Sequence, residues 1–523
     1  MKLEDAFNSL MSIASFKDIS NDLALEHIAQ LTDISFDLQK VEGAKHAIKL
    51  SDELQKRELS SFQLASLHYY LANAWAHVRE LSRRGDDLAW DWEQDELDKE
   101  IVYLRKALQS DSFEDLTAET ASSILTNLGN VFDHVGRFVE AIEYWDRALT
   151  KSPSFAMARG NRGFCLALYA GALYDQGHKI IFFKSAHNDL KNALAAPLDD
   201  GARAQFDKFK TKIESMLPED FLRQEDPLCI FSIGSTEQEI GYRQWCLDNR
   251  LFLNPLNDIG PFSIGAQDVL STPSMVVATG AGPNYQGFFN QMKQEFVSAR
   301  YLYYEGIRAK QPHFSDRDVL LINTLDYPAY SLSIEKVKAA YRIAYSLFDK
   351  IAYFLNHYLQ LFIPDKKVTF RTFWYEAQSK NKGLKSKFRR YQNWPLRGLY
   401  WLSKDLYEDK PGFKDTIEPD AQELSEIRNH LEHKYFKLHD YLWPDLRLKA
   451  EKGQMPFTDT LAFSISRREF EAKTLRLLQM MRAALIYLSL GIHCEEQQRA
   501  KGRGTSNKIG KIFLRTLRDD WKA

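Results

Sequence analysis

The chain has 523 residues, of which 44% are hydrophobic and 27% charged, a composition that excludes an intrinsically disordered protein and predicts two or three folded domains. Its four cysteines are scattered without a CxxC pair, which excludes a zinc knuckle and a disulfide framework and favours a reducing compartment. Residues 1–220 hold 25 Lys/Arg against 36 Asp/Glu (net −11), and residues 221–523 hold 44 Lys/Arg against 35 Asp/Glu (net +9). We therefore expect a polyanionic partner to bind the second half. Alternatively, the two halves simply attract each other.

The sequence predicts neither a signal peptide nor a membrane span. The first residues, MKLEDAFNSL, carry acids where a signal peptide has basic residues. The longest apolar stretch, residues 483–492, is shorter than the about 20 residues that cross a bilayer. We therefore expect a cytoplasmic protein without membrane contact.

One segment, residues 125–153, has the spacing of a helical repeat and reads LTNLGNVFDHVGRFVEAIEYWDRALTKSP. Small Gly129 and Ala141 would let two helices approach closely, while Phe132 and Trp145 fill the space beside them. These offsets resemble those of a tetratricopeptide repeat (TPR). Because one repeat cannot bury its own face, we expect at least three stacked units that bind a protein or peptide partner.

The remaining pattern predicts an all-α fold, with an N-terminal TPR-like α-solenoid followed by a C-terminal helical bundle. Prolines and glycines interrupt the region between them, whose aromatic segment 242–258 is expected to dock between domains. Apolar stripes predict long helices at 333–361 and from Arg467 to about Gln497. The predicted parts are a repeat domain at 1–216, a connector at 217–285, a bundle at 286–500 and a basic tail at 501–523.

Residues 421–438, AQELSEIRNHLEHKYFKL, carry the candidate catalytic side chains. On a helix of about 100° per residue, one arc is apolar and should face the core, and the opposite arc is polar. The apolar arc comprises Leu424, Ile427, Leu431, Tyr435 and Leu438, and the polar arc comprises Arg428, Asn429, Glu432 and His433.

The sequence Arg428-Asn429-x-x-x-His433 resembles the RNxxxH motif of the HEPN superfamily, and the resemblance extends over about residues 290–500. It implies a homodimer that pairs two motif helices into a metal-independent endoribonuclease site without a cofactor. Arg428, Asn429 and His433 would be catalytic, with Glu432 and His430 as supporting candidates. The expected products are a 2′,3′-cyclic phosphate and a 5′-hydroxyl. By the same analogy, we expect a toxin or phage-defence effector regulated through its TPR domain.

The residue types suit this reaction because RNA supplies its own nucleophile, the 2′-hydroxyl. A histidine titrates near neutral pH and can act as base or acid. An arginine is always charged and can stabilise the anionic phosphorane through its forked donors. Asn429 could orient either group by hydrogen bonding.

Other interpretations stay open. The motif could be a solvated helix face with Arg428 and Glu432 paired at i,i+4. The protein could be a non-catalytic TPR adaptor or an RNA-binding protein that uses the bundle for dimerisation. A metal site is less favoured, since no HExxH motif is present and Arg428 would repel a cation. Its ligands would be His430, His433, His439 and Asp440.

Residues 366–404 contain eleven Lys/Arg, a single acid and nine interleaved aromatic residues from Phe370 to Trp401. Cations along phosphates with aromatic platforms for bases are typical of a single-stranded RNA path. For the aromatic residues we favour the alternative, in which they pack in the core while the cations solubilise a loop. The candidate phosphate contacts are Lys385, Lys387, Arg389 and Arg390.

Overall fold

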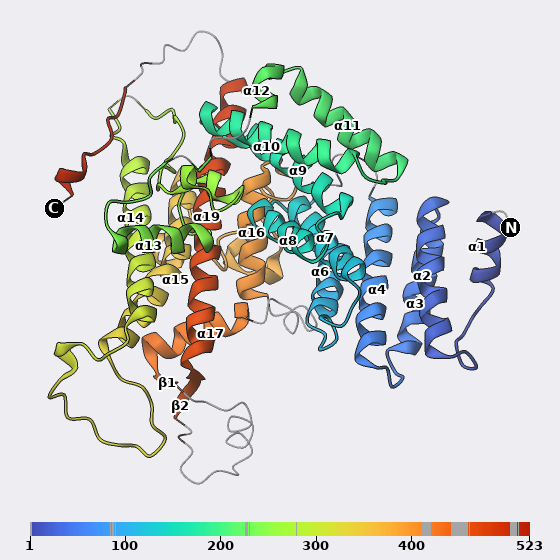
Figure 1. Ribbon diagram of the computed structural model, residues 1–523, viewed down its shortest axis with the longest axis horizontal. Helices are drawn as coiled ribbons and strands as arrows, with labels where there is room; N and C mark the ends of the chain where they lie inside the picture. The colour runs from blue at the N-terminus through green and yellow to red at the C-terminus, as the bar shows by residue number, and fades with distance from the viewer. Residues whose placement is uncertain are drawn as a thin grey trace.

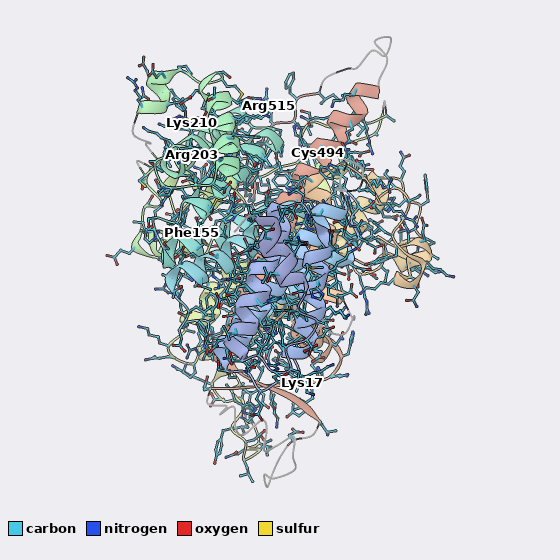
Figure 2. All side chains as sticks on the ribbon, turned by 90° about the vertical axis from the view of Figure 1, so that its right-hand side faces the viewer. Lys17, Phe155, Arg203, Lys210, Cys494 and Arg515 are labelled. Carbon is cyan, nitrogen blue, oxygen red and sulfur yellow. The ribbon has the colours of Figure 1, made fainter. Side chains whose placement is uncertain are left out.

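The computed structural model describes residues 3–83, 85, 88, 90–224, 228–229, 231–278, 280–408, 420–440, 459, 461–502, 510 and 512–522. It is predominantly helical with little strand, and it has the predicted architecture of an α-solenoid followed by a helical bundle (Figure 1). Seen from the N-terminal end, α11 (Asp200–Glu214), with Arg203 and Lys210, lies on one side of the first helices, and α19 (Arg467–Gly502), with Cys494, lies on the other (Figure 2).

The solenoid consists of antiparallel helical pairs that follow one another along the chain. A Cβ on Gly129 would lie 2.5 Å from the Nε1 of Trp145, which confirms the close approach expected between the two helices of this pair. Ser60 begins its helix with a capping box, in which its hydroxyl accepts from the Gln63 N–H. The helices are α1 (Leu3–Met11), α2 (Asn21–Asp37), α3 (Val41–Leu54), α4 (Ser61–Ser82), α6 (Asp95–Leu108), α7 (Ala118–His134), α8 (Phe138–Lys151), α9 (Ala156–Ala172), α10 (Gln176–Leu194) and α11 (Asp200–Glu214).

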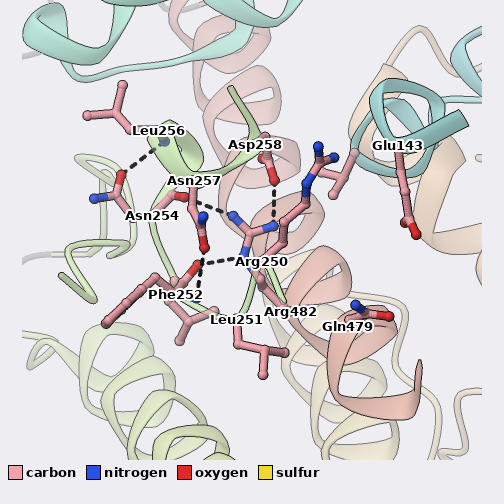
Figure 3. Close-up of polar contacts among 12 residues, drawn as sticks. Glu143, Arg250, Leu251, Phe252, Asn254, Leu256, Asn257, Asp258, Gln479 and Arg482 are labelled. Atoms are coloured by element: carbon pink, nitrogen blue, oxygen red, sulfur yellow. Dashed lines mark hydrogen bonds and ion pairs between the residues drawn. The ribbon is translucent and has the colours of Figure 1, made fainter. Parts of the chain in front are cut away.

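The connector docks between the two parts, as its aromatic segment predicts (Figure 3). Arg482 of the bundle donates to the carbonyls of Phe252 and Asn254 and to Asp258 Oδ1, the last at 2.5 Å. The other oxygen of Asp258 accepts from Tyr169 of the solenoid at 3.0 Å. One buried carboxylate therefore joins repeat, connector and bundle. The connector elements are α12 (Glu219–Arg223), α13 (Glu237–Asp248), η1 (Pro255–Asp258) and η2 (Ser263–Gly265).

The bundle is built around α19, which packs against the other four helices of the bundle and also contacts α9 of the solenoid. By length and composition α19 could cross a membrane, but 83% of its most apolar window is buried inside the fold, so it is the core helix of the bundle. The predicted helices at 333–361 and from Arg467 are present as α15 and α19. The elements are α14 (Asn284–Arg308), α15 (Leu332–Tyr358), α16 (Trp394–Tyr407), α17 (Asp420–His433), β1 (Tyr435–His439), β2 (Ala462–Ser466) and α19 (Arg467–Gly502).

The helix predicted over residues 421–438 is wrong in its last part. Helix α17 ends at His433, and Tyr435 and Leu438 lie on β1, which pairs in parallel with β2. Leu438 is buried as expected, but from a strand, whereas Tyr435 is exposed, so its predicted position in the core-facing stripe is wrong. The partner strand is more than 20 residues away in sequence, so helical periodicity carries no sign of this pairing.

Helix α16 joins the solenoid to the bundle. Its Asp405 accepts from Arg105 and Arg137 of the repeats, and all three side chains are at most 3% exposed. The backbones of Gly136 and Gly398 touch, because a Cβ on Gly398 would lie 2.1 Å from the Gly136 carbonyl oxygen. Helix α16 also packs against α17, the helix that carries the motif. The repeats therefore contact a direct neighbour of the motif helix.

Candidate active site on helix α17

Helix α17 is held in the bundle by its apolar side. Leu424, Ile427 and Leu431 are buried, which confirms this part of the predicted stripe. The hydroxyl of Tyr341 on α15 donates to the Leu424 carbonyl at 2.5 Å. With this side anchored, the polar arc faces outward.

Arg428 and Asn429 contact each other at the start of the motif. Nη1 of Arg428 donates to Oδ1 of Asn429 at 3.2 Å. The guanidinium lies 5.9 Å from the centroid of the Tyr345 ring on α15, within cation–π distance. In the described chain Arg428 does not pair with Glu432, so the alternative interpretation as an i,i+4 ion pair is wrong. Instead, Oε1 of Glu432 lies 3.6 Å from Nε of Arg342.

His433 is the last residue of α17 and is exposed. Its imidazole has no hydrogen bond or ion pair within the part of the chain that the structure describes, so both ring nitrogens are open to a substrate. His430 is held differently. Its Nδ1 lies 2.9 Å from the Glu426 carbonyl oxygen, and its ring packs 5.0 Å from Phe463 of β2.

Arg428 acts electrostatically on three acidic groups near it. Burial raises the pKa of Asp349, although the Phe370 N–H and the Arg428 guanidinium oppose this rise. Burial also raises the pKa of Tyr345 and, further, that of Tyr407, while Arg428 acts in the opposite direction on both. The guanidinium of Arg428 therefore lies close to Tyr345 of α15 and acts on the groups around it.

The aromatic residues of 366–404 have the core position that the sequence favours for them, so they are not available as RNA-stacking platforms. They pack in the hydrophobic core or against it, because the segment supplies the joint between bundle and repeats rather than a surface. Trp92 of the acidic segment before α6 packs among them, with its ring stacked 5.4 Å from that of Phe388. The fully buried members are Phe370, Phe373, Trp374, Tyr375, Phe388, Tyr400 and Trp401.

The four candidate phosphate contacts make internal bonds. Lys385 donates to the Tyr375 carbonyl and Lys387 to the Leu359 carbonyl, and burial lowers the pKa of both lysines. Arg389 donates to the Leu384 carbonyl, and Arg390 pairs with Asp91 of the repeat half at 2.9 Å. Lys387, Arg389 and Arg390 remain exposed, so a phosphate contact stays a prediction for them.

The metal interpretation has no support in the described residues, which contain no group of three or more His, Cys, Asp or Glu side chains suited to a metal ion. His439 is buried on β1, where its Nδ1 lies 3.0 Å from the Asp326 carbonyl oxygen.

Sequence reasoning also missed Arg342, which approaches the motif from α15. A helix-by-helix pattern cannot reveal such a contact because it depends on how two helices cross.

Residues 276–495 match the family model of the LA2681-like HEPN family. This match supports a place for the region in the HEPN superfamily. The HEPN region includes α14 to β2 and most of α19, and Arg428, Asn429 and His433 lie within it. HEPN domains are generally ribonucleases, so the match suggests nuclease-type chemistry. No curated protein matches the chain.

Proposed function

We propose that the protein is a metal-independent endoribonuclease whose catalytic residues are Arg428, Asn429 and His433. One observation carries the proposal: His433 is exposed, has no hydrogen bond or ion pair among the described residues, and follows an Arg428–Asn429 contact on one helix inside the region that matches the HEPN family model. A purely structural helix face has no need of this set.

The proposed reaction uses the nucleophile of the RNA. An imidazole removes the proton of a 2′-hydroxyl, and the oxygen attacks the adjacent phosphorus. Arg428 stabilises the charge that develops on the phosphorane. A second imidazole, the His433 of a second copy, donates a proton to the departing 5′-oxygen. The products are a 2′,3′-cyclic phosphate and a 5′-hydroxyl.

A homodimer is part of the proposal, and the loop between α14 and α15 offers a surface for it. The loop extends from the body at the end that carries β1 and β2 (Figure 1), and the Ala329 N–H donates to the Leu438 carbonyl at 2.7 Å. Several of its large apolar side chains are exposed to solvent, as is typical of a surface that another protein covers. Because β1 follows His433 almost directly, a second copy seated there would lie beside the motif. The most exposed of these side chains are Phe314, Leu320, Ile322 and Tyr327.

We further propose that the enzyme is a toxin or phage-defence effector whose repeats regulate the site after binding a protein or peptide. The support for regulation is a series of contacts that leads from the repeats through helix α16 to the neighbourhood of Arg428. Asp405 is held by two arginines of the repeats, and Tyr407 on the same helix α16 interacts with Tyr345, the residue beneath Arg428.

The test is incubation of purified protein with total RNA in EDTA. Wild type should cleave, and His433→Ala should lose cleavage. His357→Ala is the matched control, because His357 is also an exposed histidine but lies 12 residues, about 18 Å along α15, from Tyr345. Cleavage that persists in His433→Ala or disappears with EDTA would refute the proposal. A protein that binds a partner but cleaves no RNA with or without it would be an adaptor.

A further inference from the structure

Arg342 reaches from α15 to the end of the motif helix. Its Nη2 donates to the carbonyl oxygen of Leu431 at 2.5 Å. Its Nε lies 3.6 Å from Oε1 of Glu432, and its side chain is 40% exposed. The guanidinium therefore touches both residues that directly precede His433.

The carbonyl that Arg342 binds lies in the last turn of α17. The last four carbonyls of a helix have no intrahelical donor and must find one elsewhere. After His433 the chain turns at once into β1, and the Lys434 N–H bonds the His430 carbonyl at 3.1 Å. The Leu431 carbonyl instead accepts a hydrogen bond from Arg342, which lies on another helix. Arg342 therefore holds the last turn of α17, which carries His433.

The contact with Glu432 cannot explain the position of Arg342. At 3.6 Å it is longer than a hydrogen bond, and an exposed ion pair contributes little to stability. The bond to the carbonyl is short and charge-assisted, which makes it the stronger of the two.

We propose that Arg342 is a positioning residue for His433. The inference rests on the proposed ribonuclease activity and adds a residue to it. Arg342 acts through the Leu431 carbonyl and does not contact the RNA. Its loss would leave His433 on a looser last turn, and misplacement of a catalytic group by about 1 Å can lower a rate about 100-fold.

Helix α15 supplies a matched control. Tyr341 donates to the Leu424 carbonyl, also at 2.5 Å, but in the first half of α17. Tyr341→Phe removes one bond between the same two helices while keeping the buried ring. A general loosening of α17 would appear in both variants, whereas loss of positioning would appear only in Arg342→Ala.

The experiment measures kcat and KM on a short fluorophore–quencher RNA of mixed sequence, and hydrogen exchange of peptides that cover residues 424–438. For Arg342→Ala we expect kcat to fall 10- to 100-fold, KM to stay within about twofold and exchange to rise near His433. Arg342→Lys, which keeps a donor for the carbonyl, should recover part of kcat. Tyr341→Phe should keep the wild-type kcat.

Three outcomes would overturn the inference: unchanged kcat despite faster exchange, a rise in KM alone, or an equal loss in Tyr341→Phe. The first two would leave the proposed ribonuclease intact. Absence of cleavage by wild type would instead refute the proposed function, while unchanged exchange in Arg342→Ala would still refute the hold on the last turn.

Discussion

Asp405 supplies the sharpest stability prediction, because it is the one carboxylate that Arg105 and Arg137 share. Arg105 donates both Nη atoms to it, at 3.0 and 2.7 Å, and Arg137 binds the same carboxylate. Asp405→Asn keeps the shape of the side chain but removes its charge. Arg137 would retain Glu140 at 2.9 Å, while Arg105 would be left as a buried cation without this partner.

Removal of one partner from a buried ion pair costs about 3–5 kcal/mol, so we expect Asp405→Asn to lower the free energy of unfolding by that amount. Chemical denaturation followed by circular dichroism measures the change. Asp365→Asn is the control, because the pair of Asp365 with His357 is exposed and should contribute less than about 1 kcal/mol. A loss below about 1 kcal/mol for Asp405→Asn would refute the reasoning.

The pH dependence has a definite sign. Burial alone would raise the pKa of Asp405, but Arg105 and Arg137 outweigh it and hold the pKa well below its ordinary value. A carboxylate with a depressed pKa adds stability above its unfolded pKa of about 4, and that stability is lost as the pH falls further. Wild type should therefore lose stability below pH about 4 more steeply than Asp405→Asn.

Three further predictions concern the core, the contact between α16 and the repeats, and the proposed dimer surface. Burial raises the pKa of Asp133 to about 6, so the charged carboxylate lowers the stability of the fold as the pH rises through that value. In denaturation experiments, the free energy of unfolding of Asp133→Asn should therefore gain about 3 kcal/mol on that of wild type between pH 4 and pH 7. A difference that does not depend on pH would contradict this. Gly398→Ala should separate α16 from the Gly136 turn and increase hydrogen exchange on both sides, and wild-type protection would show that the contact is dispensable. Leu320→Asp with Ile322→Asp should convert a dimer to a monomer in light scattering and abolish cleavage, whereas an unchanged mass would exclude the loop as the interface.

The features that the sequence predicted well are those set by local periodicity. The stripe of Leu424, Ile427 and Leu431 is buried as expected, and the close packing of Gly129 on Trp145 follows from residue size alone. The exposed position of His433 follows from the same helical phase. Such patterns need no knowledge of the remaining fold.

The features that it missed depend on contacts between distant segments. The sequence favours a core position for the aromatic residues of 366–404, but it gives no sign that they pack around Trp92 of the repeat half. The strand that follows His433 forms only by pairing with β2. Arg342 reaches the motif only because α15 crosses the end of α17. Composition and spacing do not determine any of these contacts.

The most direct test of the central claim is the chemistry of the ends that the protein leaves on RNA. Wild type and Arg428→Ala are compared on the same RNA in EDTA, and the new ends are mapped before and after enzymatic phosphorylation of 5′-hydroxyls. We predict wild-type fragments with 5′-hydroxyl and 2′,3′-cyclic phosphate ends that are absent with Arg428→Ala. Fragments with 5′-phosphates, or the same fragments from both proteins, would contradict a site made of Arg428 and His433.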